Sequence, residues 1–166
     1  MHKDSARSLR ARQARVTDVT GIATLIGLFT EDGSLLPRSV WDIAASIDSY
    51  VVVTGSDGTV LACAALQEYS PPLAEVGAVA VAGSAQGLGL GSRVVRAVER
   101  LARMRGHREL FAFTLANHFF THLGYREVGV VRYPEKMARY GNSAKVGIDF
   151  GRPCAILSSR GRPLLI

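Results

Sequence analysis

A glycine-rich segment, residues 86–92, has the residue types that bind a phosphate group. It reads Gln86-Gly87-Leu88-Gly89-Leu90-Gly91-Ser92. An apolar, strand-like stretch at residues 74–81 precedes it, and apolar residues at helical spacing follow it, namely Leu90, Val94, Val98 and Leu101. Glycine lets the backbone approach a ligand closely, and a helix start offers unpaired N–H groups with a partial positive charge. The pattern predicts a phosphate-binding turn between a strand and a helix. A turn that needs glycine only for its own geometry is the alternative.

Two common phosphate motifs do not fit this segment. A Walker loop has a lysine directly after its last glycine, but Gly91 is followed by Ser92. A Rossmann turn needs a third glycine where this chain has Ser92, and its second strand ends in an acidic residue. The next strand-like stretch after the helix, residues 110–114, contains no acidic residue. The sequence therefore disfavours both nucleotide-binding folds.

Glu75 is the candidate general base. It is the only charged residue in the strand-like stretch at residues 74–81. A buried carboxylate is costly, and burial favours the protonated form, which suits a group that takes up a proton near neutral pH. A position at the exposed start of the strand, without a chemical role, is the alternative.

The pattern of apolar and turn residues predicts alternating strands and helices around the glycine segment. Strands are predicted at residues 13–17, 50–54, 60–66, 74–81, 110–114 and 127–131, with residues 145–150 as a candidate last strand. Helices are predicted from Asp18 to just before Gly33, around Val40, Ile43 and Ile47, from Leu90 onward, and at residues 117–123. The strand at residues 74–81 would hold Glu75 and lead into the glycine turn.

Two segments and the order of elements resemble one known family. The spacing Gln86-x-x-Gly89-x-Gly91 resembles the Q/R-x-x-G-x-G/A motif of the GNAT N-acetyltransferases. The segment Phe119-Phe120-Thr121-His122-Leu123-Gly124-Tyr125 is similar to their F-Y-x-x-x-G-F segment, and the element order agrees over residues 13–150. The resemblance implies the α/β GNAT (acyl-CoA N-acyltransferase) fold, with a mixed, mostly antiparallel sheet flanked by helices. We expect one such domain at residues 13–166, after a basic, disordered tail at residues 1–12.

The resemblance implies acetyl-CoA (coenzyme A) as co-substrate, without a metal. In that family the central strand pairs with the pantetheine arm of the cofactor, and the glycine motif binds its pyrophosphate. The implied cofactor contacts in this chain are Val79, Ala80, Val81, Gln86, Gly87, Leu88, Gly89, Leu90, Gly91, Ser92, Asn117 and Phe120.

The group that protonates the leaving thiolate is open. Many GNAT enzymes use the tyrosine of the F-Y-x-x-x-G-F segment, but this chain has Phe120 there, which has no proton to give. Thr114, at the end of the preceding strand, is the candidate hydroxyl. The alternatives are a thiolate that leaves without an acid and a threonine present only for its strand propensity. We expect Tyr125 to belong to the core.

Further segments resemble the acetyltransferase domain of N-acetylglutamate synthase. They are residues 18–26, 33–39, 57–58, 62–66 and 110–114. In that family a glutamate is the proposed base and arginines bind the carboxylates of the substrate, which implies these roles for Glu75 and Arg38. A guanidinium fits a carboxylate with two hydrogen bonds. An ordinary surface arginine is the alternative for Arg38, and a second carboxylate contact is left to Lys136, Arg139 or Lys145.

These resemblances imply an N-acetyltransferase that moves an acetyl group from acetyl-CoA to the α-amine of a free amino acid. L-glutamate is the expected substrate, in the first step of arginine biosynthesis, and a homodimer is compatible with the family. The first alternative is a GNAT acetyltransferase for another amine, such as a protein N-terminus, a polyamine or a drug. The second is a non-catalytic module that binds acetyl-CoA.

Composition favours a cytoplasmic protein with no membrane or nucleic-acid partner. The chain has 166 residues, 48% of them hydrophobic, and no apolar run near the ~20 residues of a membrane span. Aromatic residues are few and not interleaved with basic ones, which disfavours nucleic-acid binding despite a net charge of +6. Cys63 and Cys154 lie in apolar segments, as expected of reduced cysteines.

One face of the predicted helix that follows the glycine segment carries four arginines, Arg93, Arg96, Arg100 and Arg103. This face either attracts an anionic cofactor or is simply solvated.

Overall fold

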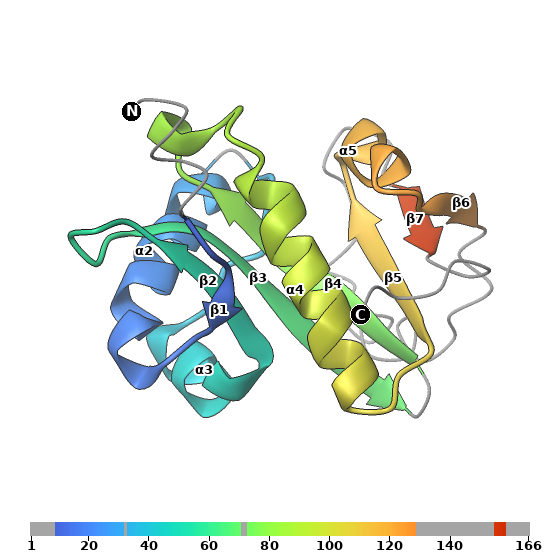
Figure 1. The fold of residues 1–166 in the computed structure, drawn as a ribbon, viewed down its shortest axis with the longest axis horizontal. Coiled ribbons are helices and arrows are strands. Elements are labelled where there is room, and N and C mark those ends of the chain that lie inside the picture. Colours follow the sequence, from blue (N-terminus) through green and yellow to red (C-terminus); the bar gives the residue numbers. More distant parts are fainter. Residues whose placement is uncertain (1–8, 32, 71–72, 129–154, 159–166) are drawn as a thin grey trace.

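Seven strands form one sheet in the described part of the chain, in the order β1-β2-β3-β4-β5-β7-β6 (Figure 1). The computed structural model describes residues 9–31, 33–70, 73–128 and 155–158. The elements in chain order are β1 (Arg12–Gln13), η1 (Val16–Asp18), α2 (Val19–Thr30), α3 (Val40–Ala45), η2 (Ile47–Ser49), β2 (Tyr50–Thr54), β3 (Val60–Ser70), β4 (Leu73–Val81), η3 (Gly83–Ala85), α4 (Leu90–Met104), β5 (Glu109–Thr114), α5 (Asn117–His122), β6 (Arg126–Val128) and β7 (Ala155–Ser158).

The sheet is mixed and mostly antiparallel, as predicted. β4 and β5 pair in parallel, and the other neighbouring strands described here pair antiparallel. A parallel pair needs a crossover, and α4 makes that crossover between β4 and β5 (Figure 1). The predicted α/β fold class is therefore confirmed.

Helices cover both faces of the sheet and bury two apolar clusters. On one face, α4 packs its predicted apolar stripe against β2, β3 and β4, and Leu90, Val94, Val98 and Leu101 are all buried. Each such side chain contributes about 1.5–3 kcal/mol on burial. On the other face, Ile22 and Ile26 of α2 and Ile43 of α3 pack against β2 and β3. The sheet is therefore sandwiched between α4 and the α2–α3 pair.

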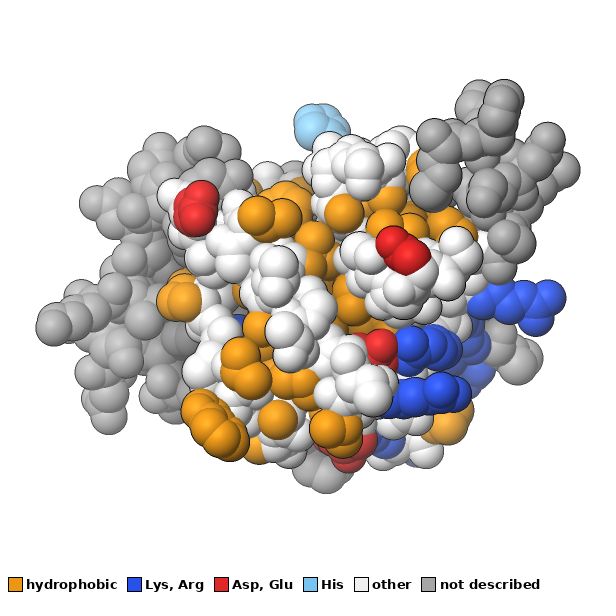
Figure 2. Space-filling model, turned by 90° about the vertical axis from the view of Figure 1, so that its left-hand side faces the viewer, with side chains coloured by type: hydrophobic (Ala, Val, Ile, Leu, Met, Phe, Trp, Pro, Cys, Tyr) orange, Lys and Arg blue, Asp and Glu red, His pale blue; other side chains and the backbone are white. Residues whose placement is uncertain are grey.

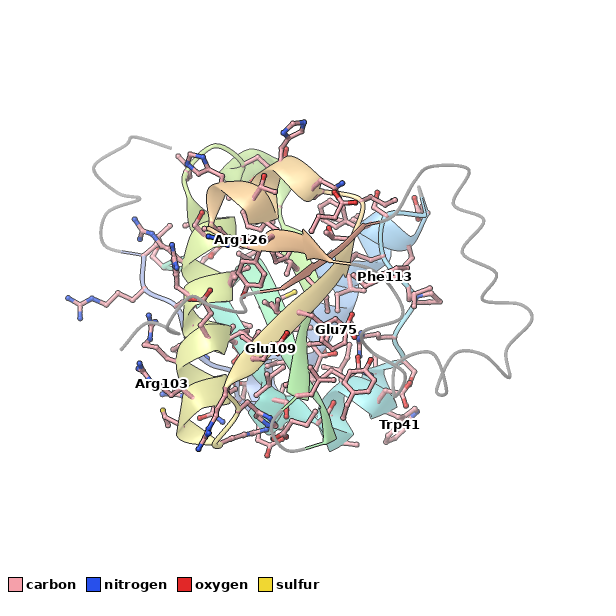
Figure 3. All side chains as sticks on the ribbon, turned by 90° about the vertical axis from the view of Figure 1, so that its right-hand side faces the viewer. Trp41, Glu75, Arg103, Glu109, Phe113 and Arg126 are labelled. Carbon is pink, nitrogen blue, oxygen red and sulfur yellow. The ribbon has the colours of Figure 1, made fainter. Side chains whose placement is uncertain are left out.

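The second helix buries less of its predicted apolar face than expected. Ile43 is buried, but Val40 is 47% exposed and Trp41 is 83% exposed. Trp41 projects outward from α3 in Figure 3. Figure 2 shows apolar side chains spread over one face of the molecule, with basic side chains grouped at one edge of it. No described helix is long and apolar enough to cross a membrane.

The predicted first strand is shorter than expected. Only Arg12 and Gln13 pair with β2, and residues 16–18 form a 3₁₀ turn instead. The Asp18 carboxylate accepts a hydrogen bond from the Arg15 N–H at 2.7 Å, and such local bonds compete with strand pairing. Residues 9–12 of the predicted tail are described, and the Leu9 carbonyl accepts a hydrogen bond from Arg93.

Predictions for the last third of the chain are met only in part. A strand was expected at residues 127–131, and β6 covers residues 126–128. Residues 129–154 lie outside the described residues. They include the candidate strand at residues 145–150 and Cys154. β7 was not predicted, because its four residues give too short an apolar run to assign. Cys63 is buried in the core, as predicted.

Two features of β4 shape its surroundings. It pairs with β5 only from Leu73 to Glu75, so among the described strands its remaining residues pair with β3 alone. Figure 1 shows β4 and β5 diverging toward the end where α5 lies.

The pairing of β4 with β3 is irregular. The register shifts between Cys63 and Ala65 of β3, and Ala78 of β4, opposite this shift, has φ +51°. A positive φ at alanine is strained, and such bulges are frequent next to active sites.

Candidate active site

The glycine turn presents backbone to its surroundings. Gly87 and Gly89 have φ +77° and +74°, a conformation that other residues rarely adopt. A Cβ atom added at either glycine would meet nothing within 4 Å, so neighbouring side chains do not cover them. Gly89 precedes α4, and no side chain caps the first N–H groups of that helix. The turn therefore leaves helix N–H donors for a ligand.

The third glycine serves a different purpose. A Cβ atom on Gly91 would lie 3.2 Å from a ring carbon of Phe119 and 3.5 Å from a methyl of Val81. Gly91 thus lets α5 and the end of β4 approach the first turn of α4 closely. Gln86 donates a long hydrogen bond, 3.4 Å, to the Val81 carbonyl at the same junction. Residues 86–92, predicted as one binding segment, therefore lie where β4, α4 and α5 meet.

The two predicted cofactor contacts on α5 differ in their surroundings. Asn117 opens the helix, and its buried side-chain oxygen has no hydrogen-bond partner among the described residues. Phe120 is only 3% exposed and packs edge-on between Phe119 and Tyr125, with ring centroids 5.0 and 5.2 Å away. The Phe120 ring is therefore part of the core, and Asn117 has the polar atom that is left to bind a ligand. Tyr125 is also buried, as predicted.

Glu75 lies in the middle of the sheet and not at an exposed strand end. It is 5% exposed and stands between Gln67 of β3 and Phe111 of β5. The Tyr69 hydroxyl donates a hydrogen bond of 2.7 Å to Glu75 Oε2. In Figure 3, Glu75 and Phe113 lie on the side of the sheet away from α4, whereas Arg103 projects from α4 on the other side. The basic face of α4 and the candidate base are therefore on opposite sides of the sheet.

Arg38 reaches the same side of β4 from the segment between α2 and α3. Its guanidinium nitrogen Nη2 lies 3.9 Å from the point that a Cβ atom would occupy on Gly77. Ser39, the next residue, caps α3 by accepting a hydrogen bond from the Asp42 N–H at 3.1 Å, which fixes the chain where Arg38 leaves it. Side chains two residues apart on a strand share a face. Arg38 therefore lies over the face of β4 that bears Glu75.

A buried tyrosine lies beside Arg38 on this face. Tyr50 pairs with Ala65 of β3, which pairs with Gly77 of β4, so one small residue separates the tyrosine from the central strand. Tyr50 is 1% exposed, and its hydroxyl has no hydrogen-bond partner among the described residues. Burial raises the pKa of this phenol, and the nearby positive charge of Arg38 opposes that effect. The hydroxyl therefore stays protonated at neutral pH and can donate a hydrogen bond.

Thr114, the candidate hydroxyl, stands at the end of β5 opposite Ala155 of β7. Its Oγ1 accepts a hydrogen bond of 2.8 Å from the Ala116 N–H, which shapes the turn into α5. A hydroxyl that accepts one bond still has a hydrogen to donate. The described residues place Thr114 on β5, beyond Phe111, which pairs with Glu75.

Sequence reasoning missed Tyr69 and Tyr50 as members of this site. Tyr69 reaches Glu75 through an irregular register between β3 and β4. Tyr50, on β2, lies close enough to Arg38 for that positive charge to act on its phenol. Neither relationship leaves a signal in residue spacing. Val79, Ala80 and Val81, the predicted contacts of the pantetheine arm, lie on the part of β4 that β5 does not pair with. Lys136, Arg139 and Lys145 lie outside the described residues. No group of His, Cys, Asp or Glu side chains in the described ranges could hold a metal ion.

Comparison with known proteins identifies related sequences and structures. The model of the Acetyltransferase (GNAT) family matches residues 24–125. The N-acetyltransferase CT2212 of Chlorobaculum tepidum, which is uncharacterized, is 31% identical over 77% of this chain and 82% of its own length. The amino-acid acetyltransferase of Ralstonia nicotianae is 34% identical over 79% of this chain but only 29% of its own length. The chain thus spans less than a third of that relative.

Solved structures agree with the sequence relatives. N-acetylglutamate synthase from Neisseria gonorrhoeae, complexed with coenzyme A and N-acetyl-glutamate, superposes with a TM-score of 0.80 and 29% identity, over 95% of this chain and 35% of that one. Rv2747 from Mycobacterium tuberculosis, in a complex that contains CoA, superposes with a TM-score of 0.77 and 22% identity, over 94% and 99% of the two chains. The second similarity is one of fold.

Proposed function

The chain belongs to the GNAT acetyltransferase family, and we propose that it moves an acetyl group from acetyl-CoA to the α-amine of a free amino acid, with L-glutamate as the expected substrate. The observation that carries the proposal is the position of Arg38 beside Gly77, on the face of β4 that bears Glu75. Residues two apart on a strand are separated by about 7 Å, a distance that a bound amino acid can bridge with a hydrogen bond at each end. Identity of 29% to a synthase complexed with N-acetyl-glutamate supports glutamate in particular.

The residues around the glycine turn fit acetyl-CoA. The uncapped start of α4 and the open space at Gly87 and Gly89 suit a pyrophosphate. The stretch of β4 that β5 does not pair with suits a pantetheine arm that hydrogen-bonds like a strand, and the buried oxygen of Asn117 can accept a hydrogen bond. When bound, the cofactor supplies the thioester carbonyl that the amine attacks.

Three side chains then have distinct roles in this proposal. Arg38 binds a carboxylate of the amino acid and holds it over Gly77. Glu75 takes the proton that the ammonium group must lose before it can attack. Thr114 donates its hydroxyl hydrogen toward the departing thiolate, because the Ala116 N–H already occupies the hydroxyl oxygen as an acceptor.

The proposal is tested by release of CoA from acetyl-CoA with a panel of amines. The panel contains free amino acids, the α-amide of glutamate, a polyamine and a peptide with a free N-terminus. Turnover with glutamate and loss of turnover with its amide support a site that binds the α-carboxylate. Turnover only with polyamines or peptides would replace the amino acid by another amine, and acetyl-CoA binding without turnover would replace the enzyme by a binding module.

A pair of arginine variants tests the carboxylate contact. Arg38→Ala should raise the KM for the amino acid at least tenfold and leave the KM for acetyl-CoA unchanged, because an ion pair with a carboxylate is lost. Arg100→Ala is the matched control, since Arg100 is an exposed arginine on α4. Equal kinetics for the two variants would remove Arg38 from the substrate site.

A further inference from the structure

Tyr69 stands at an irregularity in the pairing of β3 and β4. Glu68 pairs with Ala74 and Ser70 pairs with Leu73, so β3 has one extra residue, Tyr69, between two consecutive pairs. A bulge of this kind redirects the side chain of the extra residue. Here it brings the tyrosine to the face of the sheet that also carries Leu73 and Glu75.

The ring of Tyr69 is held in place by packing. Its centroid lies 5.6 Å from that of Phe111, with 44° between the two planes. Leu73 and Phe113 pack against Phe111 in the same small apolar cluster. Phe111 is also the residue of β5 that pairs with Glu75. The bulge and this cluster therefore determine where the hydroxyl points.

The hydroxyl of Tyr69 meets the carboxylate of Glu75. It donates to Oε2 at 2.7 Å, an ordinary length for a hydrogen bond from a hydroxyl to a carboxylate. A hydrogen bond to one carboxylate oxygen restricts the rotation of the whole group. A base must be oriented toward the proton that it takes from the substrate.

We propose that Tyr69 is a positioning residue for the base: its hydroxyl holds the Glu75 carboxylate in one orientation. The proposal rests on the proposed function, in which Glu75 is the base. Arg38 adds a positive charge over the same face of β4. The thiol of Cys63 adds no negative charge there, because burial raises its pKa to about 12.

The test is the kinetics of Tyr69→Phe, which keeps the ring and removes the hydroxyl. We expect kcat to fall by about tenfold, the effect of losing one hydrogen bond that orients the base. The KM values for acetyl-CoA and for the amino acid should not change. A kcat equal to that of the wild type, or a loss that appears only in KM, would overturn the proposal.

Tyr125→Phe is the matched control. The Tyr125 hydroxyl donates to Glu99 Oε1 at 3.2 Å, so this variant breaks another buried contact between a tyrosine and a glutamate, under α4. It should lower the melting temperature without lowering kcat. If both variants lose kcat and melting temperature to the same extent, the role of Tyr69 is only structural.

A double variant separates this proposal from the proposed function. If Glu75→Gln leaves a low residual turnover that Tyr69→Phe does not lower further, the two residues act as one unit. If Glu75→Gln leaves turnover intact, the assignment of the base is wrong. If Glu75→Gln abolishes turnover while Tyr69→Phe behaves as wild type, the base stands and the positioning role is wrong.

Discussion

The guanidinium of Arg38 and the backbone of Gly77 face each other at the centre of the molecule, with Nη2 3.9 Å from the point where a Cβ atom would lie. Arg38 belongs to the segment before α3, and Gly77 belongs to the central strand. A residue with a side chain at position 77 would project into the space below the guanidinium. The absence of a side chain at Gly77 therefore lets the guanidinium lie close to the central strand.

A branched side chain at position 77 should displace the Arg38 guanidinium and weaken binding of the amino acid. In Gly77→Val the first added carbon meets Arg38 only at ordinary contact distance, so we expect the protein to fold. The two further methyl groups should raise the KM for the amino acid by roughly tenfold or more, as steric changes in a pocket do. Gly27→Val on α2, where an added Cβ meets nothing within 4 Å, is the control. Unchanged acceptor kinetics in Gly77→Val would place the substrate elsewhere.

Tyr50→Phe should affect binding and stability in opposite directions. The Tyr50 hydroxyl is buried without a described partner, and a buried unsatisfied group costs about 1–3 kcal/mol. Removing it should leave the free energy of unfolding of the apo protein unchanged or higher. If the substrate carboxylate accepts from this hydroxyl beside Arg38, the same change should raise the KM for the amino acid severalfold. Thermal unfolding and initial rates measure the two effects, and a destabilised variant with normal KM would contradict both expectations.

The parts of the site that are local in sequence could be predicted, and the parts that depend on tertiary contacts could not. The glycine turn and the apolar stripe of α4 follow from spacing within one segment, and the structure places both as expected. The bulge at Tyr69 is invisible in the sequence, because strand pairing register depends on both strands. The distance between Arg38 and Gly77 depends on how the segment before α3 packs on the sheet. Phe120 was assigned a cofactor contact by resemblance, yet its ring lies in the core.

Gly91→Ala should weaken binding of acetyl-CoA. The added methyl would lie 3.2 Å from the Phe119 ring and 3.5 Å from Val81, so this ring on α5 must shift by a few tenths of an ångström. We expect the KM for acetyl-CoA to rise severalfold, because α5 carries Asn117, while the KM for the amino acid changes little. Gly83→Ala is the control in the same region, since an added Cβ there meets nothing within 4 Å. Equal cofactor kinetics in the two variants would show that α5 does not contact the cofactor.

Asp18 should make stability depend on pH in acid. Its carboxylate is 6% exposed and accepts hydrogen bonds from Arg12 at 2.7 and 2.9 Å, and this contact with Arg12 lowers the pKa of Asp18 from its usual 3.8. A depressed pKa in the folded protein stabilises it above pH 3.8, and this contribution is lost as pH falls through the folded value. Asp18→Asn should therefore lower the free energy of unfolding by about 1–3 kcal/mol at pH 7 and by less in acid. Urea titrations at several pH values measure this difference, with Glu31→Gln, an exposed glutamate that follows α2, as the control. A difference that stays constant from neutral to acid pH would show that Asp18 stabilises the fold without its charge.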